Sequence, residues 1–377
     1  MELTQQQLDD QARFRAFVEA EIAPHADRFD REERTPPELI RRIAQHGYLG
    51  ATLPTSYGGA GMDLVTFGLL NEEFGRGCSS VRSLLTVHSM VTHVLLKWGS
   101  QQHKQELLPQ LAGGELIGAF ALTEPNVGSD AKSVETVAEP HGDSYLLNGC
   151  KKWITYGQIA DIFLLFTRCE GKPTAFLVEA NRPGVTIKPI SGLLGVRGSM
   201  LAQIEFDGCV IPAENLVCRV GFGSSHVAAT ALDLGRYSVA WGCVGIGQAC
   251  LDASLRYTSE RQQYGVHLKE HQLIQHMITD MITNVQAARL LCYHAGQMKD
   301  KQDLRAVMDT LIAKYFASTT ASKAANDAVQ MHGANGYGSD YPVQRYLRDA
   351  KAMEIIEGSS QIQQITIAQY GYREYRQ

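Results

Sequence analysis

The chain has 377 residues, of which 44% are hydrophobic and 20% are charged, a balance typical of a globular protein with two or three packed units. The formal net charge of −5 gives no basic footprint for nucleic acid, and no apolar run is long enough to cross a bilayer. The acidic, amphipathic start MELTQQQLDDQARFRAFVEAEIAPH lacks the basic and apolar regions of a signal peptide, so we expect a cytoplasmic protein.

The first 118 residues are predicted to be mostly helical. The patterns that indicate helices are LDDQARFRAFVEAEIA, PPELIRRIAQHG with a proline at its start, and SSVRSLLTVHSMVTHVLLKWG. The third helix is expected to begin with a cap at Ser79 or Ser80, which places Arg82 in its first turn, where the helix dipole disfavours a cation. A polar stripe recurs along this otherwise apolar helix at Arg82, Thr86, Ser89 and His93. The stripe could face solvent or a pocket, and the helix pattern leaves both interpretations open.

Residues 120–130, FALTEPNVGSD, follow the helical region and precede a stretch whose composition is no longer typical of helices. The Gly128-Ser129 turn offers backbone N–H groups and a hydroxyl to a phosphate or another polar ligand, and Thr123 offers a second hydroxyl. A capped turn between two domains, without a ligand, is the alternative interpretation.

Short runs rich in Phe, Leu, Ile and Val then alternate with Gly, Pro, Asn and Asp, which predicts an antiparallel β domain. The runs are DSYLLNGCKKWIT, DIFLLFTR, TAFLVEA and AQIEFDGCVI. Trp153 and Thr155, at the end of the first run, are suited to a large flat cofactor, although a tryptophan in a β domain is more often a core residue.

No proline lies between Pro212 and Pro342, and this stretch carries long helical periodicities, including SLRYTSERQQYG and LIQHMITDMITNVQAARLLCYHAGQM. It predicts a bundle of long antiparallel helices. The GCVGIG segment at 242–247 lies inside such a pattern, which indicates close helix packing rather than a nucleotide-binding turn. The eight cysteines form no CxxC pair, and His267, His271 and His276 lack partner ligands, so we expect neither disulfides nor a metal site.

Glu357 follows two isoleucines and precedes Gly358-Ser359-Ser360 near the C-terminus. A carboxylate in a dry pocket has a raised pKa and becomes a useful proton acceptor, whereas a helix-end glutamate facing water has no such role. The local sequence alone favours the second interpretation.

Taken together, these segments resemble the acyl-CoA dehydrogenase family over essentially the whole chain. The matching pieces are LTEPNVGSD, NGCKKWIT, GVRGSMLAQIEFDGCVIPAENLV, RQQYG followed by EHQLIQ, VQMHGANGYGSDYPVQRYLRDAK and IIEGSSQIQ. Two stretches, CSSVRSLLTVHSM and GRYSVAWGCVGIGQAC, resemble the branch that oxidises acyl groups on acyl carrier proteins to make hydroxy-, methoxy- or aminomalonyl extender units for polyketides and hybrid peptides. Both also resemble glutaryl-CoA dehydrogenases.

The resemblance implies an α+β fold with an N-terminal helical domain (1–118), a middle antiparallel β domain (119–218) and a C-terminal four-helix domain (219–377). It implies FAD as the cofactor, Glu357 as the catalytic base, and two isoleucines that keep the base dry. The implied flavin contacts are Phe120, Leu122, Thr123, Gly128, Ser129, Trp153, Ile154, Thr155, Ser359 and Gln361. A neighbouring subunit of a homodimer or homotetramer would contribute Arg261, Tyr264, His271 and Gln272, and Gln330 with Gly333 would reach the ADP end of FAD.

For the substrate, the resemblance implies that Asp233 and Arg236 contact the pantetheine arm, with Ser129 and Gly358 nearby. Arg82, assisted by Ser83 and Thr86, would select a short acyl chain with a polar end. The expected substrate is an acyl thioester on an acyl carrier protein or on CoA, and the expected electron acceptor is an electron-transfer flavoprotein or another acceptor. Arg345, Arg348 and Lys351 are candidates for a basic patch that docks an acidic carrier protein, or simply a solvated helix face. The alternatives are a short-chain or glutaryl-type acyl-CoA dehydrogenase of catabolism, and a non-catalytic flavoprotein.

Overall fold

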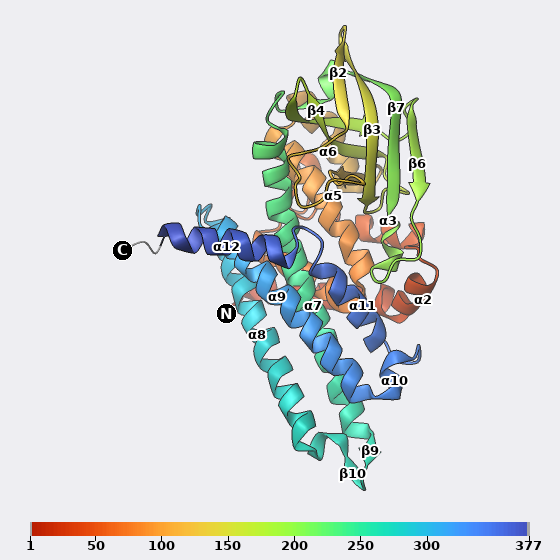
Figure 1. The fold of residues 1–377 in the computed structure, drawn as a ribbon. Helices are drawn as coiled ribbons and strands as arrows, with labels where there is room; N and C mark the ends of the chain where they lie inside the picture. Colours follow the sequence, from red (N-terminus) through yellow and green to blue (C-terminus); the bar gives the residue numbers. More distant parts are fainter. Residues whose placement is uncertain (1, 375–377) are drawn as a thin grey trace.

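The N-terminal region of the computed structural model, which describes residues 2–374, is helical, as predicted (Figure 1). Its helices are α1 (Gln5–Glu21), α2 (Ala26–Arg31), α3 (Pro37–Gln45), α4 (Leu64–Gly77), α5 (Ser79–Trp98) and α6 (Gln101–Gly113). Polar caps set their starts: the Thr4 hydroxyl accepts from the N–H of Gln7, and Asp63 Oδ1 accepts from the N–H of Thr66.

The predicted serine cap of α5 is wrong. Cys78 is the N-cap and makes no side-chain capping bond, and Ser79 is already helical. The hydroxyl of Ser80 instead accepts from the N–H of Gly198, 3.1 Å away, in a short 3-10 turn that follows β6. The start of α5 is thus fixed by a tertiary contact with the β region rather than by its own cap.

The middle region forms an eight-stranded sheet with the order β6-β7-β3-β2-β4-β5-β8, to which β1 is added beside β4. The strands are β1 (Gly118–Ala121), β2 (Val137–His141), β3 (Ser144–Ile154), β4 (Ile162–Cys169), β5 (Lys172–Glu179), β6 (Val185–Pro189), β7 (Ala202–Pro212) and β8 (Leu216–Val217). Most pairs are antiparallel, as predicted, but β1 and β2 both run parallel to β4. Strand β3 reverses the direction of β2, and β4 reverses it again. Strand β4 therefore runs parallel to β2, and it lies beside β1 in the same direction.

The C-terminal region consists of long helices, as the proline-free stretch predicts. A π-helical turn (Gly223–Ala228) leads into α7 (Ala229–Glu260), followed by α8 (Gln272–Asp300), α9 (Ala306–His332), α10 (Ala334–Tyr337), α11 (Val343–Met353) and α12 (Ser360–Glu374). The helical pattern of SLRYTSERQQYG is wrong beyond Glu260, because β9 (Gln262–Gln263) and β10 (Val266–His267) form a hairpin there. Its two central residues, Tyr264 and Gly265, have φ values of 56° and 81°, which a tight hairpin turn requires.

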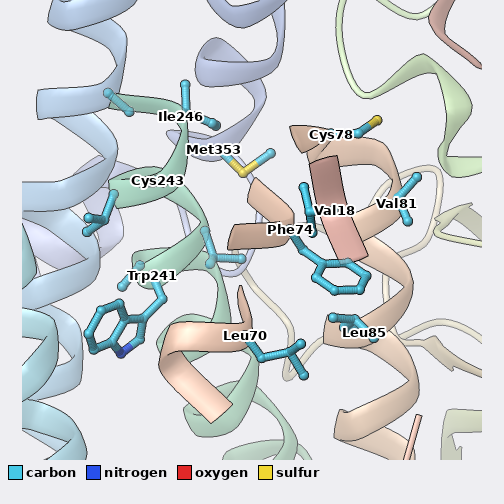
Figure 2. Packing of buried hydrophobic residues seen from close by; sticks show 14 of the residues in the cluster. Val18, Leu70, Phe74, Cys78, Val81, Leu85, Trp241, Cys243, Ile246 and Met353 are labelled. Carbon is cyan, nitrogen blue, oxygen red and sulfur yellow. The ribbon is translucent and has the colours of Figure 1, made fainter. Parts of the chain in front are cut away.

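Glycines let α4 and α7 approach each other closely, as the GCVGIG segment indicates. A Cβ on Gly245 would lie 2.1 Å from the carbonyl oxygen of Glu72, and one on Gly75 would lie 2.5 Å from that of Gly242. Figure 2 shows apolar side chains of α4, α5 and α7, among them Phe74 and Trp241, converging in this part of the core. Helices α4, α5 and α7 also contribute residues to the site described below, together with the turn between α11 and α12.

Figure 1 shows the sheet at one end of the molecule and the β9–β10 hairpin at the opposite end of the long helices. The turn between α11 and α12 lies between these two ends, beside α7 and α9. Within residues 2–374 no helix is both long and apolar enough to span a membrane. The domain division at 118/119 and 218/219 stays a prediction; β1 begins at Gly118, and the π-helical turn begins at Gly223.

Candidate active site

Glu357 lies in the turn between α11 and α12, with its backbone in the left-handed region at φ 54°, followed by Gly358 at φ 89°. A bulky residue at such a φ is strained, and strain of this kind is concentrated at functional sites. The turn aims the carboxylate at α7, where a Cβ on Gly235 would lie only 2.6 Å from Glu357 Oε2. Oε2 is fully buried and has no hydrogen-bond partner within residues 2–374.

The prediction that both isoleucines dry the pocket is wrong for one of them. Ile355 is 61% exposed in the single chain, whereas Ile356 packs against the main apolar cluster. The difference follows from the turn, in which successive side chains point to different sides. The groups that enclose the carboxylate include Gly235 and Met90, whose Sδ approaches the same Cβ position at 2.7 Å.

The charges of three cations act on the Glu357 carboxylate. Burial raises the pKa of Glu357 to about 7, although Arg236, Lys314 and Arg82 each act to lower it. A carboxylate with this pKa is a far better proton acceptor than one in water, and it is still ionised in a useful fraction of molecules at neutral pH.

Two of these cations also hold the backbone of the turn. Arg236 Nε donates to the carbonyl of Glu357 at 3.1 Å, and Lys314 Nζ donates to the carbonyl of Gly358 at 2.9 Å. Gln363 Nε2 reaches the Gly358 carbonyl as well, at 3.1 Å. The left-handed turn is therefore fixed from α7, α9 and α12 together.

Arg82 is fully buried, so the interpretation in which its polar stripe faces solvent is wrong. Nη1 donates to Thr86 Oγ1 at 2.5 Å, whereas Nη2 makes only longer contacts of 3.4 Å with Ser83 Oγ and Met353 Sδ. Nε has no partner within residues 2–374, and no carboxylate of these residues lies within ion-pair distance. A buried arginine without a carboxylate is costly unless another group compensates its charge.

Two glycines of α7 make room for these two side chains. Gly235 lies under the carboxylate of Glu357, and a Cβ on Gly242 would lie 2.4 Å from Arg82 Cδ and 2.7 Å from its Nε. Seven residues are nearly two helical turns, so the glycines share one face of α7 and are about 10 Å apart along the axis. The base and the arginine thus stand on the same side of α7, separated by roughly the length of a short acyl chain.

The loop after β1 is fastened to β3 by a buried ion pair. Lys151 Nζ donates to Glu124 Oε1 at 2.6 Å and to the carbonyl of Leu122 at 3.1 Å. Glu124 also accepts bonds from the backbone N–H groups of Glu135 and Thr136, and these donors together with Lys151 outweigh burial and lower the pKa of Glu124. The loop is consequently fastened to β3 at Leu122 and Glu124, on either side of Thr123.

The structure brings the predicted flavin residues of the loop and of β3 together. The N–H of Lys152 donates to the carbonyl of Thr123 at 2.9 Å, which sets the loop beside the end of β3. Gly128 and Ser129 are exposed, and a Cβ on Gly128 would meet nothing within 4 Å. The side chain of Ile154 is buried in the apolar cluster of the sheet, so only its backbone is free to reach a ligand.

Trp153 does not belong to the core. Its indole is 47% exposed, and its φ of 64° places it in the left-handed region. A large aromatic ring held out of the core beside exposed loop amides and the hydroxyls of Thr123 and Thr155 fits a flat ring system with a phosphate-bearing tail. The residues present on this face therefore fit FAD.

A cavity of about 220 Å³ lies between this loop and Arg236, the residue that donates to the carbonyl of Glu357. Its lining includes Leu122, Phe166, Thr167, Ser224, Leu232 and Arg236. Asp233, the other predicted contact to the substrate arm, forms an ion pair with Lys299 at 2.5 Å and keeps a buried Oδ1 without a partner within the described residues. Of the two residues predicted to contact the substrate arm, Arg236 lines the cavity.

The remaining predicted flavin residues lie elsewhere in this chain. Arg261 and Tyr264, which is 96% exposed, are on the β9–β10 hairpin, at the opposite end of the molecule from the sheet (Figure 1). His271 and Gln272 begin α8, and Gln330 and Gly333 end α9; all are partly or fully exposed. Ser359 and Gln361 lie next to the base, at the start of α12. One chain by itself does not assemble the complete set.

The three cations predicted to dock a carrier protein do not form a free basic patch. Arg345 is paired with Asp27 at 2.8 Å, Arg348 with Asp30 at 2.6 Å, and Lys351 with Glu354 at 3.1 Å. The first two pairs hold α11 against the N-terminal helices. These charges therefore bind within the chain, although their spacing is the same as that of a solvated helix face.

Several residues at the site were missed from the sequence: Gly235, Gly242, Ser238, Asn71 and Lys314. Lys314 carried a usable signal, because it is a single cation in the otherwise apolar or small run TLIAKYFAS, and it is fully buried. The glycines carried none, since α7 contains many small residues that serve helix packing.

Three family models match the chain in succession. They are the N-terminal domain (residues 4–115), the middle domain (119–209) and the C-terminal domain (225–371) of acyl-CoA dehydrogenase. An acyl-CoA dehydrogenase of Bacillus subtilis is 40% identical over 376 residues, covering 98% of this chain and 99% of the relative. A glutaryl-CoA dehydrogenase of Desulfococcus multivorans is 36% identical over 368 residues, covering 95% and 94%.

Solved structures superpose over nearly the full length. The glutaryl-CoA complex of a glutaryl-CoA dehydrogenase has a TM-score of 0.95 at 35% identity, covering 100% of this chain and 98% of the other. A Mycobacterium smegmatis glutaryl-CoA dehydrogenase with FADH2 gives 0.94 at 28%, covering 99% and 97%. FkbI, for biosynthesis of a methoxymalonyl extender unit, gives 0.88 at 30%, covering 96% and 99%. The prolyl acyl carrier protein oxidase AnaB gives 0.92 at 28%, covering 98% and 99%.

Proposed function

Because this chain belongs to the acyl-CoA dehydrogenase family of FAD-dependent oxidoreductases, we propose that it oxidises a short acyl thioester with a polar end. The observation that carries the proposal is the fully buried Arg82, which has no carboxylate partner and stands on the same face of α7 as Glu357. A polar group at the far end of the acyl chain would compensate this charge, whereas a plain fatty acyl chain would leave it unpaired.

Glu357 is the proposed base that removes the α-proton of the thioester. That proton is too weakly acidic for a carboxylate unless the thioester carbonyl is polarised, and the backbone N–H of Glu357 is the proposed protein donor to the oxygen. Arg236 and Lys314 hold the turn that presents both groups. When bound, FAD supplies the hydride acceptor.

The proposed position of the cofactor is the face formed by Phe120, Leu122 and Thr123 with Trp153 and Thr155. Gly128 and Ser129 would bind the pyrophosphate, and Ser359 and Gln361 would close the flavin site. Away from the flavin face lie residues that are partly or fully exposed, which supports a homodimer or homotetramer in which they serve a neighbouring subunit: Arg261, Tyr264, His271, Gln272, Gln330 and Gly333. An electron-transfer flavoprotein is the proposed acceptor of the electrons.

For the biological role we propose extender-unit formation on an acyl carrier protein. The likeness to FkbI and AnaB supports it, and the cavity that ends beside Arg236 is suited to the pantetheine arm that carrier proteins and CoA share. The second candidate is a glutaryl-type or short-chain acyl-CoA dehydrogenase of catabolism, which the similarity to the Desulfococcus multivorans enzyme favours.

Anaerobic flavin reduction tests both parts of the proposal. The purified protein is mixed with butyryl and glutaryl thioesters and with a short hydroxyacyl thioester that keeps a β C–H bond, each on CoA and on an acyl carrier protein, and bleaching of the flavin band is followed. Polar-ended acyl groups should bleach the flavin faster than butyryl, and the carrier-bound forms should act faster than the CoA forms. Fastest reduction by butyryl-CoA would contradict the proposal, and no bleaching by any thioester would favour a non-catalytic flavoprotein.

A further inference from the structure

We propose that Ser238 and Asn71 are positioning residues that orient Arg82, through Thr86, for recognition of the acyl end. The inference rests on the proposed function, in which Arg82 contacts that end. It assigns a task to two residues on α7 and α4 that carry no charge.

Four side chains from three helices form one continuous hydrogen-bonded chain. Arg82 Nη1 donates to Thr86 Oγ1 at 2.5 Å, Thr86 Oγ1 lies 2.6 Å from Ser238 Oγ, and Ser238 Oγ donates to Asn71 Oδ1 at 2.6 Å. All four residues are buried, with exposed fractions between 0% and 4%. Because water does not reach the chain, each bond in it has no ready substitute.

Asn71 fixes the direction of this chain. Its Nδ2 donates to the carbonyl of Phe67 at 2.8 Å, so Oδ1 is the atom that faces Ser238 and accepts its proton. A hydroxyl has a single proton, so Ser238 must accept from Thr86, and Thr86 must accept from Arg82. Neither hydroxyl then keeps a proton for a ligand, so among Arg82, Thr86 and Ser238 only the guanidinium has donors left to serve an acyl end.

The guanidinium is held firmly at one edge and loosely at the other. Nη1 is anchored in the chain, but Nη2 has only contacts of 3.4 Å and Nε has none within residues 2–374. Arginine is long and flexible, and its planar fork is useful for recognition only when its orientation is fixed. The anchoring of Nη1 sets the plane of the fork, and the Nε–Nη2 edge, which has no strong partner within residues 2–374, is the edge we assign to a substrate oxygen.

A buried network could also serve only to satisfy its own polar groups. Thr86 has a local alternative in the carbonyl of Arg82, one turn back, but that contact is 3.5 Å long. A purely structural network would affect all substrates alike when it is broken. A positioning network should affect the polar-ended substrate selectively, and this difference makes the two explanations separable.

The test uses the FAD-loaded protein and compares Ser238→Ala, Arg82→Met and the double variant. Rates of anaerobic flavin reduction are measured with glutaryl-CoA and with butyryl-CoA over a range of concentrations. Ser238→Ala should lower the ratio of the glutaryl-CoA rate to the butyryl-CoA rate by about 5-fold, the equivalent of one hydrogen bond. The main cause should be a higher concentration of glutaryl-CoA at half-maximal rate. The double variant should have the same glutaryl-to-butyryl ratio as Arg82→Met alone. Ser238 acts on the substrate only through Arg82, so its loss has no further effect once the arginine is gone.

Two further variants complete the design. Ser238→Thr keeps the hydroxyl and should restore the ratio, and Ser254→Ala is the matched control. Ser254 is a fully buried serine of the same helix, and its hydroxyl has no partner within the described residues. If Ser238→Ala leaves the ratio unchanged, whether both rates stay the same or both fall equally, the positioning role is overturned while the proposed function stands. An unchanged ratio in Arg82→Met would overturn the proposed function itself.

Discussion

The carboxylate of Glu357 occupies the space that a side chain on Gly235 would need. A Cβ at Gly235 would lie 2.6 Å from Glu357 Oε2 and 2.9 Å from its Cδ, although the two residues are more than 120 positions apart in the chain. Both contacts involve the end of a flexible side chain rather than backbone, so the helix could accept a methyl group only by displacing the carboxylate together with Met90 Sδ, which lies 2.7 Å from the same position.

Gly235→Ala should therefore leave the fold intact and impair the chemistry. Alanine is about 1 kcal/mol better than glycine inside a helix, which offsets part of the crowding, but a displacement of the base by about 1 Å can cost on the order of 100-fold in rate. The measurement is flavin reduction by substrate together with thermal unfolding. Gly247→Ala is the control, because its Cβ would meet Val285 instead of the site. Full activity in Gly235→Ala would show that the carboxylate works from a different position.

Glu357→Gln should retain FAD and fold while losing flavin reduction. Glutamine has nearly the same shape and lacks only the proton acceptor, so a loss of at least about 100-fold, the lower range for general-base catalysis, is expected. Rapid mixing under anaerobic conditions measures it, with the flavin absorbance of the free protein as evidence of an intact site. Substantial remaining turnover would place the base elsewhere.

The rate of flavin reduction should rise with pH and level off above about 7. The pKa of Glu357 is raised to about 7 by burial, so the base is mostly protonated, and inactive, below this value. Below the midpoint the rate should fall about tenfold per pH unit, as expected for one ionising group. A pH series of single-turnover rates at low substrate concentration measures the profile. A midpoint near the ordinary glutamate pKa would mean that the carboxylate is hydrated when it acts.

Lys314→Met should shift this profile to higher pH. The lysine cation lowers the pKa of Glu357, and removing it leaves burial less opposed, so the midpoint should rise. Methionine keeps the length of the buried stem, but it cannot donate to the Gly358 carbonyl, so the limiting rate should also fall, by about 5-fold for one hydrogen bond. Lys323→Met, on the same helix but paired at the surface with Asp280 and Asp327, is the matched control and should leave the profile unchanged. A profile identical to that of the parent protein would show that Lys314 serves stability alone.

Trp153→Ala should weaken the retention of FAD before it affects proton removal. The indole is half exposed, so the fold loses little, and alanine keeps the Cβ and with it the left-handed backbone strain. The ratio of flavin to protein after gel filtration is the measurement, and Trp153→Phe, which keeps an aromatic face, should retain most of the cofactor. Full FAD in Trp153→Ala together with lost turnover would reverse the assigned role.

Much of the architecture follows from local sequence alone. The long helices α7, α8 and α9 are visible in the 3.6-residue periodicity of a proline-free stretch, because that pattern depends on neighbours within one or two turns. The sheet is visible in short apolar runs between turn residues. The end of α7 was mispredicted because the Tyr264-Gly265 hairpin turn depends on positive φ values at two positions, and only one of them is a glycine.

The segment that bears the base, and the family to which it belongs, could also be identified from the sequence. Motifs such as LTEPNVGSD and IIEGSSQIQ keep the chemistry-bearing residues next to the glycines that their backbone requires. The sequence could not show whether Arg82 faces water, since a polar stripe at helical spacing has the same pattern on a surface and around a buried network.

That question was decided by tertiary structure, because the answer depends on which helix crosses α5. Helix α7 brings Gly242 under Arg82 and Ser238 against Thr86, and it brings Gly235 under Glu357, from more than 120 residues away in each case. The burial of one carboxylate, its lost hydration and the effect of three cationic charges on its pKa all depend on these long-range contacts. The sequence determines which residue types are present, but the raised pKa of Glu357 and the orientation of Arg82 depend on the packing of the helices.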